Sequence, residues 1–367
     1  MSTFDLLPDL VVELDRLVPP EEAAGDWDDV LRRIDPPRRR RRARPARKLV
    51  LLAGALFVVL VAVAAATYLI LQHRPRPGAL TVAVGGHNLR WPVQIIQVMP
   101  NGRSVVLWRC PSTTGCGEPE GMDWAPDGRH VAFTVDAFNG ARTDPYLGLH
   151  VLDLQTNRDV RVVAEYDAAH ARPRCLDPAA VAWSPDSKVL AFDCTAFGGW
   201  SWVWLAAPDG SQRRRLPTGN LRAAAPSWSP DGTRIVFAAS DGGIYIVRLD
   251  GSGLRRVVTH GSVPDWSPDG SKIAYEARDG VRLVTPTGQD VTPLRGIGPA
   301  GTPVWSPDGR EIAVTVAGSG LYVVAGNGRD RHHVPIRDDV GSIGRPAWYP
   351  AGPVAKPVPS PTSCQAC

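Results

Sequence analysis

The sequence predicts an all-β fold: a six-bladed β-propeller of four-stranded antiparallel blades, preceded by one transmembrane helix and a short cytoplasmic tail. The first observation behind this prediction is a short phrase beginning with Trp that recurs at the spacing of a propeller blade. The second is a content of 36 Gly and 35 Pro among 367 residues, which is typical of a chain with many turns. The third is an uncharged stretch, residues 49–71, which is long enough to cross a bilayer as a helix.

Residues 1–48 form the predicted cytoplasmic tail, which is acidic over residues 1–35 and rich in Arg after them. Two apolar stripes with helical spacing lie in its acidic part, at Leu6–Leu17 and at Trp27–Ile34. An apolar stripe needs a surface to cover it, and a segment this short cannot build a core of its own. Two interpretations stay open, a solvated tail and a docking element for a cytoplasmic partner.

The predicted transmembrane helix runs from Leu49 to Leu71, directly after eight Arg and Lys residues between Arg38 and Lys48. Only two Arg residues follow it closely, so the positive-inside rule places the N-terminus in the cytoplasm and the rest of the chain outside. A signal peptide cleaved near Ala62-Val63-Ala64 is the alternative. The basic run before the span is explained by the membrane topology and needs no nucleic-acid partner. The net charge of the chain is also only +4, so we expect no binding of nucleic acid.

After a linker, residues 72–78, the predicted propeller covers residues 79–352, and a Pro-rich tail with a Cys pair ends the chain at residues 353–367. The repeated phrase reads Trp, Ser or Ala, Pro, Asp, then Gly or Ser, followed by an apolar run. Five good copies and a decayed sixth begin at Trp124, Trp183, Trp228, Trp266, Trp305 and Trp348. Their spacings of 59, 45, 38, 39 and 43 residues are those of blades.

The phrase has the chemistry of a hairpin turn. Pro sets φ at the second turn position, Asp bonds its own backbone, and Gly takes the positive φ. The apolar run that follows has strand composition, and a second hairpin comes after it, as at Ile244–Val247 with the turn Asp250-Gly251. Each repeat therefore carries four short strands and no helix, which is the unit of a β-propeller.

The two ends of the repeat region are predicted to share one blade. Leu80–Val84, Val93–Val98 and Ser104–Trp108 supply three strands without a first one, and Arg345–Trp348 supplies a first strand with nothing after it. Joining them completes a sixth blade, closes the ring and covers two sheet edges. Seven blades are the alternative, but the sequence contains no seventh phrase.

Over residues 79–352 the repeated phrase, continued by runs such as Ile273-Ala274-Tyr275, resembles the WD-like repeat of the TolB family. The resemblance implies a protein-binding propeller of the bacterial envelope, as in TolB, whose propeller docks a peptidoglycan-associated lipoprotein. This chain departs from that pattern in its predicted anchor, its acidic tail and its lack of an N-terminal TolB domain. With the predicted topology, we expect a single-pass protein of a bacterial plasma membrane with a protein or cell-envelope partner outside. The tail resembles those of membrane proteins from high-GC bacteria, some of which bind sigma factors.

Residues that recur in every copy are expected to be structural. A Trp at the same place in each phrase predicts packing, and the repeated Asp predicts a turn and not a metal ligand. The Trp residues are the six that begin the phrases, and the aspartates are Asp127, Asp186, Asp231, Asp269 and Asp308. We expect no cofactor and no metal.

The first blades carry insertions with aromatic residues outside the phrase, and loops on a rigid scaffold are where binding usually occurs. The candidate binding residues are Phe138, Tyr146, Phe197 and Trp200. Packing of these loops on the blade rim is the open alternative.

All six cysteines lie beyond the predicted membrane span, which favours disulfides in an oxidising compartment. Pairing of neighbours is the simplest connectivity: Cys110 with Cys116, Cys175 with Cys194, and Cys364 with Cys367.

The sequence favours a non-catalytic binding or sensing protein. It contains no G-x-S-x-G nucleophile elbow, no phosphate-binding loop and no HExxH motif. Two alternatives remain. One is a transmembrane transducer that acts through residues 1–35. The other is a propeller lyase or hydrolase that uses Asp123, Asp265 and His260, whose spacing alone does not show whether they converge.

Overall fold

The computed structural model describes residues 79–85, 93–99, 103–111, 121–135, 146–164, 175, 177–196, 200–289, 292–294, 301–316, 320–336 and 342–350. All of them belong to one unit of the chain, Tyr68–Cys367. No helix in these ranges has the length and apolar character needed to cross a membrane. The predicted tail, membrane helix and linker, and the Pro-rich C-terminal tail from residue 353, lie outside the described residues.

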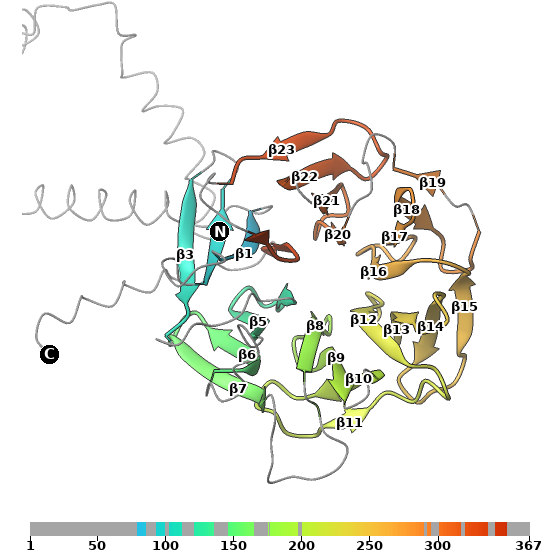
Figure 1. The fold of residues 1–367 in the computed structure, drawn as a ribbon, viewed down its shortest axis with the longest axis horizontal. Coiled ribbons are helices and arrows are strands. Elements are labelled where there is room, and N and C mark those ends of the chain that lie inside the picture. The colour runs from blue at the N-terminus through green and yellow to red at the C-terminus, as the bar shows by residue number, and fades with distance from the viewer. Residues whose placement is uncertain are drawn as a thin grey trace, which may run out of the picture. The chain divides into compact units, whose positions relative to one another are not determined.

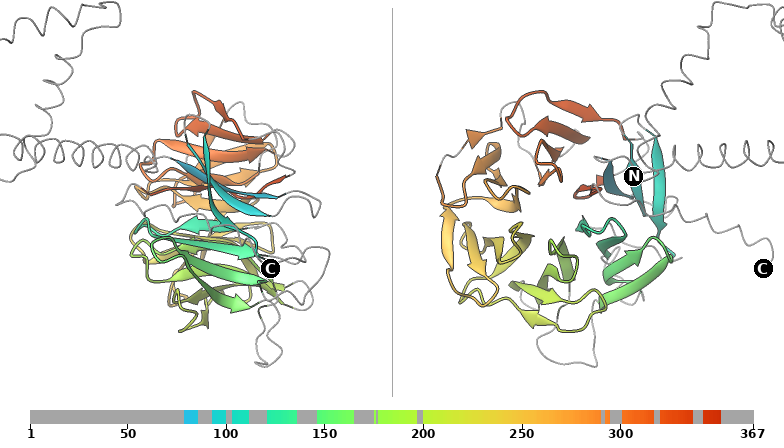
Figure 2. Two further views of the ribbon diagram at one scale, coloured as in Figure 1. Left: turned by 90° about the vertical axis from the view of Figure 1, so that its left-hand side faces the viewer. Right: turned by 180° about the vertical axis from the view of Figure 1, so that it is seen from behind.

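Six antiparallel sheets stand around a central axis, as Figure 1 shows down that axis and Figure 2 shows from the side and from behind. Five of them are blades of four consecutive strands. From the inside outward these are β4 (Met122–Trp124), β5 (His130–Val135), β6 (Gly148–Asp153) and β7 (Arg158–Ala164); β8 (Asp177–Trp183), β9 (Leu190–Ala196), β10 (Trp200–Ala206) and β11 (Arg214–Arg215); β12 (Ala223–Trp228), β13 (Arg234–Ala239), β14 (Ile244–Arg248) and β15 (Arg255–Val258); β16 (Ser262–Trp266), β17 (Ile273–Ala277), β18 (Gly280–Val284) and β19 (Thr292–Pro293); β20 (Pro303–Trp305), β21 (Glu311–Val316), β22 (Gly320–Ala325) and β23 (His332–Val334). The prediction of six four-stranded blades is confirmed, and the seven-bladed alternative is wrong.

The sixth sheet joins the two ends of the repeat region. It contains β1 (Leu80–Gly85), β2 (Gln94–Val98) and β3 (Ser104–Arg109), and the innermost position is filled by β24 (Ser342–Ile343) and β25 (Ala347–Trp348). Both short strands pair with β1, with Val84 opposite Ile343 and Leu80 opposite Trp348. The expected closure is confirmed, but the single closing strand expected at Arg345–Trp348 is two strands.

The interruption between the two closing strands has a backbone reason. Gly344, Arg345 and Pro346 lie between them and outside the strands. Pro346 has no N–H to donate to a ladder, so a continuous strand would lose a bond there. The break takes Arg345 out of the ladder.

The hydrophobic core is divided into six layers, one between each pair of neighbouring sheets. In a typical layer, Ala191 and Val203 of one blade pack with Ile235 and Phe237 of the next, together with Trp228. The six repeat tryptophans are all buried, with exposed fractions of 4–8%. Because every layer needs both of its blades, each blade depends on its neighbours, including across the closure.

A disulfide joins Cys175 to Cys194, with their Cα atoms 5.3 Å apart, as neighbour pairing predicts. It ties the strand β9 to the segment that precedes β8. Cys110 is also disulfide-bonded. The other three cysteines, Cys116, Cys364 and Cys367, lie outside the described residues.

Candidate functional site

A cavity of about 340 Å³ lies among the innermost strands of the blades. Figure 1 shows these strands around the axis of the ring. Its wall is largely aromatic and proline: it contains all six repeat tryptophans and Pro126, Pro185, Pro230, Pro268, Pro307 and Pro350. The charged residues among its described lining are Asp123, Asp265 and Arg345. Pockets of ~300–1,000 Å³ with apolar walls and a few placed polar groups are typical of ligand sites.

The position directly before the repeat Trp connects neighbouring blades. Where its side chain carries an oxygen, that oxygen accepts the backbone N–H of the Trp in the next blade. Trp183 N lies 2.7 Å from Asp123 Oδ2, and Trp305 N lies 2.7 Å from Asp265 Oδ2. Trp266 N lies 3.1 Å from Ser227 Oγ. These three bonds join blades through side chains that the repeated phrase does not include.

At Ala182 and Val304, which occupy the same position, the indole N–H of the next Trp makes the connection instead. Trp228 Nε1 donates to the carbonyl oxygen of Ala182 at 3.2 Å, and Trp348 Nε1 donates to that of Val304 at 2.9 Å. In the two blades that follow an Asp, the indole nitrogens of Trp183 and Trp305 are buried and have no hydrogen-bond partner among the described residues. In these two blades the bond from the backbone N–H of the Trp to the carboxylate therefore takes the place of the indole bond, and the indole N–H is left without an acceptor in the described part of the chain.

The cavity brings two distant aspartates and one arginine into one electrostatic cluster. Arg345 Nη2 lies 3.5 Å from Asp265 Oδ1, with only 7% and 14% of the two side chains exposed. Ser227 Oγ donates to the same carboxylate oxygen at 3.2 Å. Asp123 lines the same cavity. The charge of Arg345 lowers its pKa, and the charge of Asp265 raises it.

Burial raises the pKa of Asp123 to about 7, because the ionised carboxylate loses its hydration. The backbone N–H of Trp183 and the charge of Arg345 oppose this shift only in part. Burial also raises the pKa of Asp265. The charge of Arg345, the backbone N–H of Trp305 and the hydroxyl of Ser227 lower it, but only in part. At neutral pH the cluster can therefore hold a proton on Asp123.

Replacing Ser227 with Ala is expected to destabilise the propeller by about 1–3 kcal/mol. The change removes the acceptor of Trp266 N–H, which is buried, and one donor to the carboxylate of Asp265. Urea unfolding of the two proteins measures the difference. Ser211→Ala on an exposed turn serves as the matched control, and equal losses in both variants would contradict the connecting role of Ser227.

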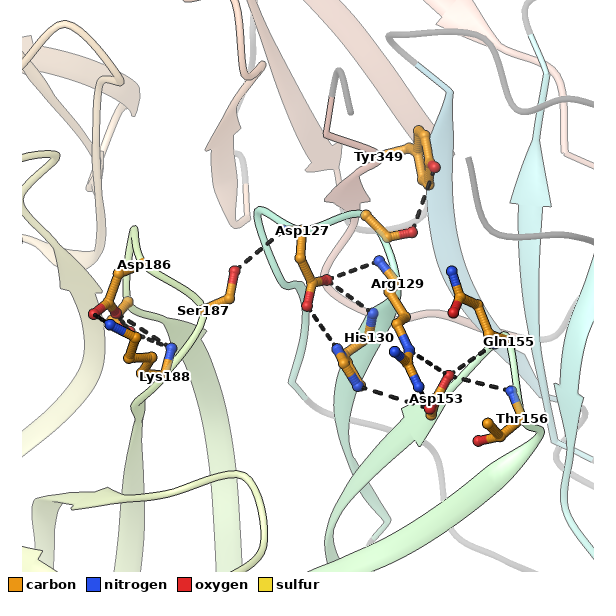
Figure 3. Close-up of polar contacts among 12 residues, drawn as sticks. Asp127, Arg129, His130, Asp153, Gln155, Thr156, Asp186, Ser187, Lys188 and Tyr349 are labelled. Atoms are coloured by element: carbon orange, nitrogen blue, oxygen red, sulfur yellow. Dashed lines mark hydrogen bonds and ion pairs between the residues drawn. The ribbon is translucent and has the colours of Figure 1, made fainter. Parts of the chain in front are cut away.

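The repeated aspartates have a different role from the cavity aspartates. Figure 3 shows Asp127, whose Oδ1 accepts the backbone N–H of Arg129 at 2.8 Å, and whose own N–H donates to Ser187 Oγ of the next blade at 3.1 Å. In the same way Asp186 Oδ1 accepts the hydroxyl of Ser184 at 2.7 Å, and this bond holds the pKa of Asp186 below its usual range. These carboxylates close turns, and the described residues contain no group of three or more His, Cys, Asp or Glu that could hold a metal.

The two predicted loop residues that the structure describes, Tyr146 and Trp200, are not part of the described cavity lining. Phe138 and Phe197 lie outside the described residues, and Trp200 is the first residue of β10. Tyr146 packs against the core layer of Phe133, and its carbonyl oxygen accepts a bond from His150 Nε2 at 2.9 Å. His260 is also absent from the described lining of the cavity.

Sequence reasoning missed Arg345 as a functional residue. The signal for the cavity was present in the position before each Trp, which is Asp, Ala, Ser, Asp, Val and Ala around the ring. This position varies while the phrase beside it stays constant, so its polar residues are not explained by the structural role of the phrase. Arg345 shows no such signal. No other blade has a charged residue three positions before its Trp, so no pattern of the repeat pointed to this position.

Comparison with known proteins agrees with this architecture. The chain has a fold like that of TolB from Acinetobacter baumannii, with a TM-score of 0.58 and 21% identity over 79% of this chain and 71% of that one. A putative TolB from Agrobacterium tumefaciens matches with a TM-score of 0.50 and 18% identity over 70% of this chain and 89% of that one. At these identities the likeness is one of fold.

A curated relative is the uncharacterized peptidase YuxL from Bacillus subtilis (strain 168), which is 27% identical over 119 residues. The match covers 32% of this chain and 17% of the relative. This chain therefore covers less than a fifth of that relative's length. The family model of the TolB beta propeller domain matches residues 121–352, which is more than half of the chain. The chain belongs to the TolB beta propeller domain family.

Proposed function

We propose that this chain is a non-catalytic binding protein of the cell envelope, in which the propeller lies outside the plasma membrane and receives part of a protein partner in its axial cavity. The observation that carries the proposal is the cavity itself. Its walls of Trp and Pro surround a small charged cluster, and all six sheets contribute residues to it.

Two features support the location. The uncharged stretch at residues 49–71 follows a run of basic residues, as expected for an anchor with a cytoplasmic N-terminus. The disulfide between Cys175 and Cys194 fits an oxidising compartment, since disulfides are rare in the cytosol.

The chemistry of the cavity lining supports a binding role over a catalytic one. Its described residues include no Cys, His or Lys. The hydroxyls of Ser267 and Ser306 donate to Asp269 and Asp308 within their own turns. The hydroxyl of Ser227 donates to the carboxylate of Asp265, but it also accepts the backbone N–H of Trp266, and the described lining holds no His beside this pair. The peptidase title of the Bacillus relative belongs to a protein of which the match covers only 17%.

Site-specific photocrosslinking in intact membranes tests the binding site. A photoreactive side chain at Pro268, an exposed residue of the cavity lining, is expected to give an adduct with an envelope protein. The same side chain at Thr287, an exposed residue of the turn between β18 and β19, is the matched control. Absence of an adduct at Pro268, or equal adducts at both positions, would contradict binding in the cavity.

Protease treatment of intact spheroplasts tests the location. With one epitope tag at each end of the chain, the C-terminal tag is expected to be lost and the N-terminal tag kept until the cells are lysed. The reverse pattern, or protection of both tags before lysis, would contradict the proposed topology.

A further inference from the structure

Three buried donors of residues that line the axial cavity have no acceptor among the described residues. Five buried side-chain atoms of the described residues have no hydrogen-bond partner. Three of them belong to residues of the cavity wall: Trp183 Nε1, Trp305 Nε1 and Arg345 Nη1. All three are N–H donors, so the groups missing from this region are acceptors.

Arg345 is the charged member of this set. Its side chain is only 7% exposed, and the ion pair at Nη2 with Asp265 has a separation of 3.5 Å, longer than a good N–H···O bond. Its Nη1 has no acceptor among the described residues. A buried guanidinium normally has its donors filled, because an unmet charged donor costs more than a neutral one.

The fold holds this guanidinium in place. Arg345 lies between β24 and β25, and both strands pair with β1. Gly344 N donates to the carbonyl oxygen of Ala83, which fixes the backbone directly before it. The donor is therefore built into the closing segment of the ring and is not part of a surface loop.

We propose that Arg345 binds a carboxylate group of the peptide segment that enters the axial cavity. This inference rests on the proposed function, since it names the chemical group by which that site recognises its partner. The planar guanidinium matches the two oxygens of a carboxylate, and the Trp and Pro walls cover the apolar part of the segment.

The charges of the cluster favour a monoanion. Asp123 and Asp265 would repel an anion if both were ionised, but burial raises the pKa of both, that of Asp123 to about 7. A protonated Asp123 offers an O–H donor in place of a negative charge. Arg345 already faces the carboxylate of Asp265, so a bound carboxylate adds one negative charge to the cluster and a phosphate dianion adds two; the carboxylate therefore fits better.

Peptide titration of the full-length protein in detergent tests the proposal, with the fluorescence of the cavity tryptophans as the readout. The probes are acetyl-Ala-Ala with a free carboxylate, its C-terminal amide, acetyl-Glu amide and inorganic phosphate. We expect at least tenfold weaker binding of acetyl-Ala-Ala amide than of the free acid. Binding of acetyl-Glu amide would show that a side-chain carboxylate also enters the site. Equal affinity of acid and amide, phosphate binding tighter than the acid, or no binding by either carboxylate would overturn the proposal.

Arg345→Gln is expected to weaken binding of the free acid by about tenfold to a hundredfold, the range for loss of a charge-assisted bond. Arg345→Lys keeps the positive charge but lacks the paired N–H donors of the guanidinium, so an intermediate loss of affinity is expected. This variant also provides a test if Arg345→Gln does not fold. Arg310→Gln, in an exposed turn, is the control. Unchanged affinity in folded Arg345 variants would overturn the proposal.

The same variants separate this inference from the proposed function. An adduct at Pro268 that Arg345→Gln leaves unchanged would overturn the carboxylate site and keep the protein-binding propeller. Absence of the adduct in the wild-type background would remove both.

Discussion

A chain that ends at Gly341 is expected to lose the cooperative fold of the propeller. The truncation removes β24 and β25, so β1 becomes an open edge of its sheet. It also removes Trp348 and Tyr349, which are 6% and 1% exposed and belong to the two core layers on either side of the closing sheet. Two aromatic side chains of about 150–250 Å² each, at about 25 cal/mol per Å², contribute up to about 8–12 kcal/mol. That is as large as the whole stability of a typical domain, about 5–15 kcal/mol.

The matched control for this truncation is a chain that ends at Pro350, which retains both closing strands. Thermal unfolding followed by circular dichroism, together with limited proteolysis, compares the two. We expect a cooperative transition only in the chain that ends at Pro350. Equal melting temperatures would show that the closing segment contributes little and would contradict the role assigned to the closure.

Replacing Asp123 with Asn is expected to stabilise the protein at pH 8 and to have little effect near pH 4. The folded-state pKa of Asp123 is raised to about 7, against 3.8 for an unperturbed aspartate. Between these values the folded state holds a proton that the unfolded state has released, so the free energy of unfolding falls as the pH rises. Below about pH 4 both states are protonated and no penalty exists, and above about pH 7 the full penalty is present.

The size of the effect follows from the shift of the pKa. About three pKa units at 1.36 kcal/mol each set an upper limit of ~4 kcal/mol, and relaxation of the site brings the expected gain to about 2–4 kcal/mol at pH 8. The Asn side chain keeps an oxygen that can accept the N–H of Trp183. Urea unfolding at pH 4, 6 and 8 measures the gain.

Asp231→Asn provides a control of opposite sign. The hydroxyl of Ser229 donates to Asp231 and holds its pKa below the usual range, so its ionised form stabilises the folded state above the unfolded pKa. We therefore expect Asp231→Asn to destabilise the protein at pH 8. If Asp123→Asn lost stability at pH 8 as well, burial would not be the dominant influence on Asp123.

Much of the fold could be predicted because each repeat carries its own local signals. The turn phrase and the apolar run after it lie within a few residues of each other, so the hairpins could be assigned without knowledge of their neighbours. The closure could be predicted by counting strands, because an incomplete blade at each end leaves two open edges. The form of the closing segment could not, since the break at Pro346 depends on how β1 pairs with both β24 and β25.

The candidate site was harder to predict because its members come from distant parts of the chain. Asp123 and Asp265 belong to two different sheets, and Arg345 lies between the two closing strands of a third, so their spacing along the chain does not show that they meet. The aromatic residues of the loops were the more conspicuous candidates, but Tyr146 packs in a core layer. Conspicuous residue types indicated surface loops, whereas the walls of the cavity are the Trp and Pro residues of the repeated phrase, and its charged residues lie beside that phrase.

Sequence alone was sufficient for the number of blades, the order of the strands and the closure of the ring, because local turn and strand chemistry repeats within every blade. Tertiary structure was needed to show that Asp123, Asp265 and Arg345 share one buried cluster and that Arg345 Nη1 has no acceptor among the described residues. Those two facts depend on the closing of six blades around one axis and on the loss of hydration inside it. Neither is a property of any single segment.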